Sequence, residues 1–247
     1  MGVTLVTFQG SVGSGKTTTA RALTAILRSR SIISYYVDIA VFHGFAYFVI
    51  ATISHIVQKL GGYRYVGNHY LTLWFNNKSL LRKVYRISLL LDIPSLIIAV
   101  MIRVYLKILL CTLLRRCCTI LVDEGPLTAM AIHYYFSRQF NTIRLFKHYY
   151  RIAYALLFES TKSQKSFFIM LEQPLRSSIK AWIRREKTNL VDFNMISTRL
   201  AFENILLNYL SESSGILVLR LKVASIGSVV AEVTRRILTM NTCCANP

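Results

Sequence analysis

Short β-prone runs alternate with longer helical patterns along this chain. The segments between most of the runs carry apolar residues three and four positions apart, as amphipathic helices do. Strands that alternate with helices are typical of an α/β fold with a parallel sheet flanked by helices. The β-prone runs cover residues 3–8, 32–37, 118–123, 166–171 and 216–221.

The helical patterns fit the same interpretation, and a chain of 247 residues fits one domain over residues 1–247. A long segment separates the second β-prone run from the third, so we expect a helical insertion after the second strand. Helical patterns cover residues 17–30, 127–160, 194–212 and 225–240, and a further helix begins at residues 172–174.

The insertion, residues 39–118, is apolar and basic, with ten basic residues and one acid, Asp92. Residues 39–58 carry no charged side chain over twenty positions, which is long enough to cross a membrane. A second apolar stretch, residues 87–102, is interrupted by Asp92 and Pro94. A membrane hairpin would translocate the basic segment between the two stretches, against the positive-inside tendency. We therefore expect helices packed on the sheet, with peripheral contact between residues 39–118 and a membrane surface as the alternative.

The charge balance favours anionic partners. Thirty basic residues against eleven acidic ones give a formal charge of +19. Nucleotides, nucleic acid and acidic lipid all fit this charge. The basic residues are scattered along the chain and form no tail, so the composition indicates no specific nucleic acid.

The five cysteines form no recognisable framework. They are Cys111, Cys117, Cys118, Cys243 and Cys244, an odd number with two adjacent pairs and no Cys-x-x-Cys spacing. This pattern suggests neither a disulfide framework nor a zinc site. No secretory signal is recognisable before the first β-prone run, so we expect a reducing, cytoplasmic location.

Between the first β-prone run and the first helix lies a glycine-rich loop with the spacing Gly-x4-Gly-Lys-Thr. In such a loop, backbone N–H groups and the helix N-terminus face a polyphosphate. We expect Lys16 to reach the β- and γ-phosphates of ATP and the Thr17 hydroxyl to bind Mg²⁺. The alternative is a glycine-rich turn that binds nothing. The expected ATP-binding residues are Gly10, Ser11, Val12, Gly13, Ser14, Gly15, Lys16, Thr17 and Thr18.

Two acids end β-prone runs. Asp123 ends an apolar run and is followed by the turn-forming sequence Glu124-Gly125-Pro126. The carboxyl ends of parallel strands meet at one edge of the sheet, where ligands bind. We therefore expect Asp123 to hold Mg²⁺ together with Thr17. Asp38 ends the second run and either faces a substrate at the same edge or is an ordinary turn aspartate.

The order of these elements resembles the nucleoside and nucleotide kinases of the P-loop class, and most of all the thymidylate-kinase-like branch. The resemblance spans nearly the whole chain, and its sharpest parts are residues 10–17, 120–126 and 171–187, with Tyr209 matching a tyrosine often seen in the family. It implies a P-loop NTPase three-layer fold and a lid at residues 172–192. It also implies transfer of the γ-phosphoryl of ATP, with Mg²⁺, to a small acceptor.

One residue departs from that branch, which usually has Asp-Arg where this chain has Asp123-Glu124. The arginine of the family grips the phosphate of the acceptor. A carboxylate at this place would repel a nucleoside monophosphate unless an arginine intervened. Glu124 could instead accept a proton from a hydroxyl acceptor or help to hold the metal.

The lid-like segment carries a row of cations. Arg176, Lys180, Arg184 and Lys187 lie at offsets 0, 4, 8 and 11, so in a helix they form one stripe, with Arg185 beside it. The resemblance implies that Arg176, Arg184 and Arg185 act in catalysis together with Lys16. We expect Glu124 to join them through its own carboxylate. The alternative is a solvated helix face.

Besides Asp38, four candidates for binding the acceptor rest on composition alone, and the alternative for each is a core or surface position. They are Arg82, Arg86, Phe42 and Phe45.

Two functions remain open. The first is an ATP- and Mg²⁺-dependent phosphotransferase whose acceptor is a nucleoside monophosphate or a nucleoside. The second is a nucleotide switch or ATPase, associated with a membrane surface or a protein partner, that phosphorylates no small acceptor. A homodimer is compatible with either function. An exposed apolar surface on residues 39–118 would favour the second.

Overall fold

The computed structural model describes most of the chain outside the first half of the insertion. Several predictions fall outside the described residues: those for Val12, Phe42, Phe45, Lys187, Cys243 and Cys244, and most of the apolar run 39–58. The described residues are 3–11, 13–39, 46, 48, 49, 51–53, 56, 78–114, 117–162, 165–186, 193–223 and 225–240.

The described strands form one five-stranded sheet in which every pairing is parallel. The order is β2-β3-β1-β4-β5, so the first strand of the chain lies at the centre. This sheet confirms the predicted parallel α/β architecture. The strands are β1 (Val3–Gly10), β2 (Ile33–Asp38), β3 (Cys118–Asp123), β4 (Lys165–Glu172) and β5 (Leu217–Lys222).

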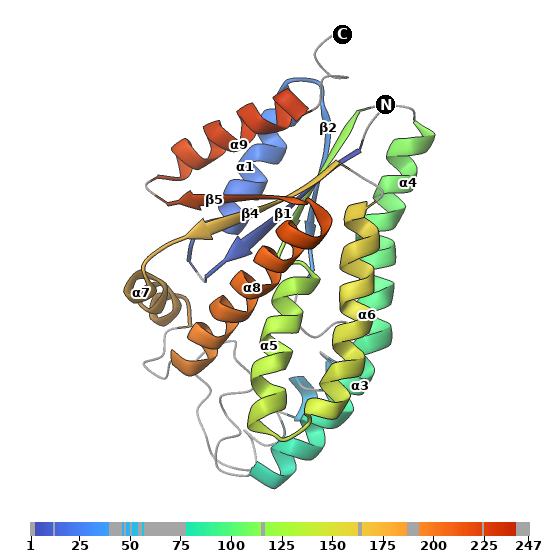
Figure 1. Cartoon of the computed structure of the whole chain (residues 1–247), viewed down its shortest axis with the longest axis vertical. Helices are drawn as coiled ribbons and strands as arrows, with labels where there is room; N and C mark the ends of the chain where they lie inside the picture. The colour runs from blue at the N-terminus through green and yellow to red at the C-terminus, as the bar shows by residue number, and fades with distance from the viewer. Residues whose placement is uncertain are drawn as a thin grey trace.

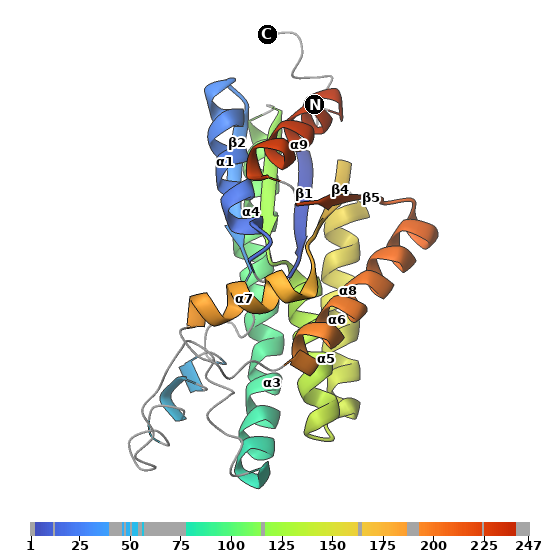
Figure 2. The same ribbon diagram turned by 90° about the vertical axis from the view of Figure 1, so that its left-hand side faces the viewer.

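Helices cover both faces of the sheet, which gives three layers (Figures 1 and 2). Successive residues of β1 point to opposite faces. Val6 and Phe8 pack with α1 and α9, whereas Leu5 packs with the helices of the other layer. The sheet is therefore buried on both sides. One layer holds α1 (Lys16–Ser29) and α9 (Ile226–Met240), and the other holds α3 (Lys78–Val100), α4 (Leu106–Leu113), α5 (Pro126–Gln139), α6 (Ile143–Lys162) and α8 (Phe193–Ser214).

The helices α3 and α4 form one long helix through a π-helical turn, η2 (Met101–Tyr105). It runs along the right-hand edge of the molecule in Figure 1, beside α6. The helix continues through Asp92 and Pro94, which interrupt the apolar pattern of the sequence. One face packs on α6 and, through α4, on the sheet, so the prediction of packed helices is confirmed for that face of residues 82–113.

A hydrogen-bonded cluster joins this helix to α5 and α6. Asp92 is fully buried, and its Oδ2 lies 3.1 Å from His133 Nε2 and accepts a 3.1 Å hydrogen bond from Tyr149. The Tyr85 hydroxyl lies 3.1 Å from His133 Nδ1 and 3.2 Å from Ser137 Oγ. We call these five residues the helical cluster. It makes His133 a packing residue of the helical layer.

The helical region predicted over residues 127–160 is confirmed, and the structure divides it into two helices, α5 and α6. Asn141 adopts a left-handed conformation with φ 52°, and the Thr142 amide donates to the Ser137 carbonyl at 2.9 Å. This pattern ends many helices, and asparagine is one of the few residues that tolerate it. The apolar period continues across the break and hides it in the sequence.

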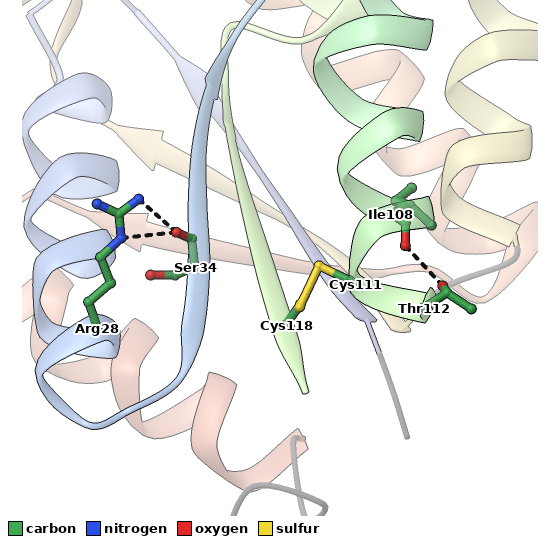
Figure 3. Close-up of a disulfide and its surroundings, with 6 residues drawn as sticks. All are labelled: Arg28, Ser34, Ile108, Cys111, Thr112 and Cys118. Carbon is green, nitrogen blue, oxygen red and sulfur yellow. Dashed lines mark hydrogen bonds between the residues drawn. A yellow bond between two sulfur atoms is a disulfide. The ribbon is translucent and has the colours of Figure 1, made fainter. Parts of the chain in front are cut away.

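A disulfide joins Cys111 of α4 to Cys118, the first residue of β3 (Figure 3). The expectation that the cysteines form no disulfide is therefore wrong for this pair. Their spacing alone could not show the bridge, because the turn from α4 into β3 brings their Cα atoms to 5.9 Å. The same view shows Arg28 of α1 donating two hydrogen bonds to the Ser34 carbonyl, which ties α1 to β2.

Candidate functional site

The loop between β1 and α1 adopts a conformation that requires glycine. Gly10, Gly13 and Gly15 have φ values of 133°, 77° and 85°, which other residues rarely adopt. A Cβ atom on Gly10 would also lie 2.5 Å from the Leu171 carbonyl oxygen of β4. The loop therefore lies tightly against the carboxyl edge of the sheet.

Lys16 follows this loop as the first residue of α1, and its side chain is only 5% exposed. The ammonium donates to the carbonyls of Gly10 at 3.0 Å and Ser11 at 2.8 Å. Burial, and secondarily Arg199, lower the pKa of Lys16. A buried cation thus sits within the loop, beside the positive N-terminal end of α1.

Asp123 ends β3 next to the loop and is 2% exposed. Its Oδ2 accepts hydrogen bonds from Thr17 Oγ1 and, at 3.1 Å, from the Tyr36 hydroxyl. Its Oδ1 is buried without a hydrogen-bond partner in the described part of the chain. Burial raises the pKa of Asp123, although the hydrogen bond from Thr17 opposes this shift.

The Asp123–Thr17 pair fits Mg²⁺. Magnesium binds hard oxygen ligands, often through one or two protein groups, and keeps several of its waters. The buried Oδ1 of Asp123 is a carboxylate oxygen that a cation would satisfy. No group of three or more His, Cys, Asp or Glu side chains within the described residues is arranged to hold a metal. A site built on one carboxylate and one hydroxyl therefore suits this ion.

Sequence reasoning missed Tyr36. Burial, and then Asp123, raise the pKa of Tyr36 to about 12, so it stays a donor to Asp123 at neutral pH. Its strand β2 pairs with β3 in parallel, which brings Tyr36 beside Asp123. No motif in the sequence marks this contact.

Sequence reasoning also missed Arg199 and Glu203 of α8, which reach the loop from far along the chain. Arg199 Nε donates to Glu203 Oε1 at 2.8 Å, and Arg199 Nη2 donates to the Gly10 carbonyl at 3.3 Å. Burial lowers the pKa of Arg199, but Glu203 and Glu124 raise it by more. The guanidinium therefore stays charged although it is only 5% exposed.

Glu124 lies between two cations. Its Oε1 is 3.8 Å from Lys16 Nζ and 3.6 Å from Arg199 Nη2. The backbone of Glu124 is left-handed with φ 51°, a strained conformation that clusters at functional sites. The departure from Asp-Arg thus places a carboxylate at the loop with an arginine beside it.

Several buried polar atoms around the loop have no partner among the described residues. Thr128 donates to Gln9 Oε1 at 2.8 Å, whereas Gln9 Nε2 has no hydrogen-bond partner in this part of the chain. Of the seven such side-chain atoms among the described residues, four belong to the loop and its neighbours: Gln9 Nε2, Ser14 Oγ, Asp123 Oδ1 and Glu203 Oε2. Buried polar groups are rarely left unsatisfied in proteins, so this concentration indicates a ligand site. We call these residues, with Lys16, Thr17, Glu124 and Arg199, the loop cluster.

The helix α7 (Leu175–Glu186) covers the loop from beyond the carboxyl edge of the sheet (Figure 2). Ser178 Oγ donates to Ser11 Oγ at 2.6 Å. A Cβ atom on Gly13 would lie 2.1 Å from Ala181 Cβ, so only glycine lets α7 pack this closely. The segment that the resemblance assigns to a lid is therefore in direct contact with the loop.

The cationic stripe of α7 points to solvent, since the side chains of Arg176, Lys180 and Arg184 are exposed. Arg185 is seven residues after Ser178, so helical spacing places its position on the loop-facing side of α7. The side chain of Arg185 and the whole of residues 187–192 lie outside the described residues.

Of the candidate acceptor residues, the structure brings Asp38 to the site. Asp38 pairs with Asp123 across β2 and β3, and burial, Asp123 and Glu124 raise its pKa. Neither Arg82 nor Arg86 forms a hydrogen bond or ion pair with the loop among the described residues. Arg86 instead lines a groove at the turn between α5 and α6.

The wider comparisons add no family to this geometry. A scan against profiles of known protein families finds no match, and a search of curated proteins finds no significant relative.

Proposed function

We propose that this chain is an ATP- and Mg²⁺-dependent phosphotransferase of the P-loop kinase type, whose acceptor is a nucleoside monophosphate or a nucleoside. The observation that carries the proposal is the arrangement of Lys16, Thr17 and Asp123 around one tight loop. A buried cation, a hydroxyl and a carboxylate with an unsatisfied oxygen are the groups that a magnesium–polyphosphate complex needs.

The protein's own groups have separate tasks in this reaction. The loop amides and the N-terminus of α1 bind the phosphates of the donor, and Lys16 neutralises their charge. Asp123 and Thr17 would hold Mg²⁺, which supplies charge neutralisation and orientation when bound. The helix α7 keeps water away from the loop through its contact at Ser11 and Gly13.

The acceptor side is defined by Glu124, Arg199 and Asp38. Two cations, Lys16 and Arg199, face two carboxylates, Glu124 and Glu203, so the charge of Glu124 is balanced locally. This balance removes the repulsion that a lone Glu124 would exert on a monophosphate acceptor. Asp38 and Glu124 also give the site two carboxylates that could accept the proton of an acceptor hydroxyl.

The direct test is ATP-dependent phosphorylation of a panel of nucleosides and nucleoside monophosphates by the purified chain, with and without Mg²⁺. We expect a phosphorylated product from at least one acceptor and none without Mg²⁺. Asp123→Asn serves as the matched control, because it removes a charge but keeps the shape of the side chain. Turnover that is equal in both proteins would contradict the proposed site.

A second candidate function, a nucleotide switch or ATPase without a small acceptor, is favoured by one observation. The helix α3–α4 exposes a long row of apolar side chains on the insertion. Such a surface is typical of a site that contacts a membrane or another protein. A kinase that acts on small molecules does not require one. ATP hydrolysis that proceeds at the same rate with and without every acceptor of the panel would support this function over the first.

A further inference from the structure

One face of the long helix α3–η2–α4 is apolar and exposed to solvent. Ten of the eighteen large hydrophobic side chains that are exposed among the described residues lie on it or on Leu114 directly after it. Their spacing of three or four residues forms one stripe, about 40 Å long at 1.5 Å per residue. We call it the apolar stripe: Ile87, Leu90, Ile98, Met101, Ile102, Leu106, Leu109, Leu110, Leu113 and Leu114.

The opposite face of the same helix is fixed to the protein. Leu89, Asp92 and Leu96 are fully buried, and Asp92 bonds to α5 and α6 through the helical cluster. Cys111 is bonded covalently to β3. A helix that crossed a bilayer alone would have to break these contacts.

The helix is nonetheless apolar enough for a membrane. Residues 82–113 contain a window of mean hydropathy 2.3, of which only 28% is buried. A core helix of this composition would be mostly buried, and a helix that is apolar all round indicates contact with apolar surroundings on both sides. Among the described residues, the protein supplies such surroundings on one side only.

The charges around the apolar stripe indicate which kind of partner lies against it. Lys83 and Arg86 are exposed cations at one end of the stripe. Asp92 is the only acid in residues 82–114, and it is buried. A second copy of this chain would bring the same cations together, in a protein with a formal charge of +19. An anionic lipid surface offers both apolar contact and opposite charge.

We infer that the apolar stripe docks on an anionic lipid bilayer. The helix lies parallel to the membrane surface, its inner face stays packed on the protein, and the cations contact the lipid headgroups. This attachment does not depend on the proposed function, because none of the loop cluster takes part in it. It holds for a transferase and for a switch alike.

The test is cosedimentation of the full chain with phosphatidylcholine vesicles, with and without phosphatidylglycerol. We expect binding to the anionic vesicles, weak binding to the neutral ones, and release of the protein by high salt or carbonate. Ile102→Gln with Leu109→Gln should abolish binding. The matched control, Ile205→Gln with Leu217→Gln, changes two exposed apolar residues on α8 and β5 and should bind as the wild type does.

A second pair of variants tests the charge. Lys83→Gln with Arg86→Gln should lower the partition onto anionic vesicles by more than about tenfold, because each cation near an anionic surface contributes a factor of about five. Lys165→Gln with Lys222→Gln removes the same charge from the sheet and should change it much less. Retention after a carbonate wash would show a spanning helix instead. A dimer that the Ile102→Gln and Leu109→Gln variant dissociates, without vesicle binding, would show a second copy as the partner. Either result overturns the inference.

Discussion

The helical cluster and the loop cluster both bury charged and polar side chains, but they differ in how completely these are satisfied. In the helical cluster, none of the five residues buries a side-chain nitrogen or oxygen without a hydrogen-bond partner. In the loop cluster, Gln9, Ser14, Asp123 and Glu203 each bury an atom without one. Burial of a polar group costs free energy unless it is hydrogen-bonded. The first cluster therefore holds helices together, whereas the second keeps buried groups that a bound ligand would satisfy.

The largest effect is expected in the helical cluster, on stability. Asp92→Ala removes the acceptor of His133 and Tyr149 and should lower the free energy of unfolding by about 3–5 kcal/mol. Urea unfolding followed by circular dichroism measures it. The control is Ser88→Ala, one turn earlier on α3, since the buried Ser88 hydroxyl has no partner among the described residues. Ser88→Ala should leave stability within about 1 kcal/mol of wild type. Equal losses in the two variants would mean that Asp92 contributes no more than its packing.

Lys16→Ala should do the reverse and remove function while it preserves the fold. Its bonds to the Gly10 and Ser11 carbonyls hold a cation for the phosphates, so ATP affinity or turnover should fall by about a hundredfold, or about 2.7 kcal/mol. Calorimetric titration with ATP measures the affinity, and thermal unfolding checks the fold. If the folded variant bound nucleotide as tightly as the wild type does, the loop would be a glycine-rich turn that binds no phosphate.

Asp123→Asn separates metal binding from nucleotide binding. The charge that fits Mg²⁺ is lost while the loop amides remain, so turnover at limiting Mg²⁺ should fall by about tenfold with ATP affinity nearly unchanged. A titration of turnover against Mg²⁺ checks it. Superimposable titrations for the two proteins would exclude Asp123 as a metal ligand.

We also expect the effect of Asp123→Asn on thermal stability to depend on pH. Burial raises the pKa of Asp123, so the folded chain binds this proton more tightly than the unfolded chain does. Its contribution to stability therefore falls as pH rises from the ordinary aspartate range through the raised pKa. Without Mg²⁺, Asp123→Asn should melt at a higher temperature than wild type at pH 7, and the gain should shrink toward pH 4. A gain that grows as pH falls would contradict this assignment.

The smallest effects concern the cover of the loop cluster. Arg185 occupies a loop-facing position of α7, whereas Arg184 is exposed on the solvent side. Arg185→Ala should lower kcat by about tenfold with ATP affinity spared, as for other arginines that stabilise phosphoryl transfer. Arg184→Ala, its matched neighbour, should lower kcat less. Steady-state kinetics with any accepted substrate distinguish the two variants. Wild-type kcat in both would show that the cations of α7 form only a solvated helix face.

The features that the sequence could predict are those formed by residues close together along the chain. The loop at residues 10–17 and the acid at Asp123 are local patterns, and the structure brings them together at one sheet edge. Arg199 and Glu203 could not be found this way, because they reach the loop from a helix almost 190 positions later. Nor could the break at Asn141, where the apolar period runs on unchanged.

The apolar stripe shows a different limit of sequence reasoning. Both faces of α3–α4 are apolar, so the periodicity indicates a helix but not which face turns outward. Only the positions of α6 and β3 decide it, through Asp92 and Cys111. The prediction of helices packed on the sheet therefore holds for one face of this helix and not for the other.

The central place of β1 has a consequence for synthesis. β1 leaves the ribosome before both of its partners, since β3 begins at residue 118 and β4 at residue 165. Because translation adds about 5–20 residues per second, both edges of this apolar strand stay unpaired for on the order of ten seconds. The long helix α3–α4 forms within that interval from local contacts, which are faster than pairing between distant strands. During translation, the chain therefore exposes β1 and the apolar helix together before any sheet exists to cover them, and this period is when a chaperone would bind it most strongly.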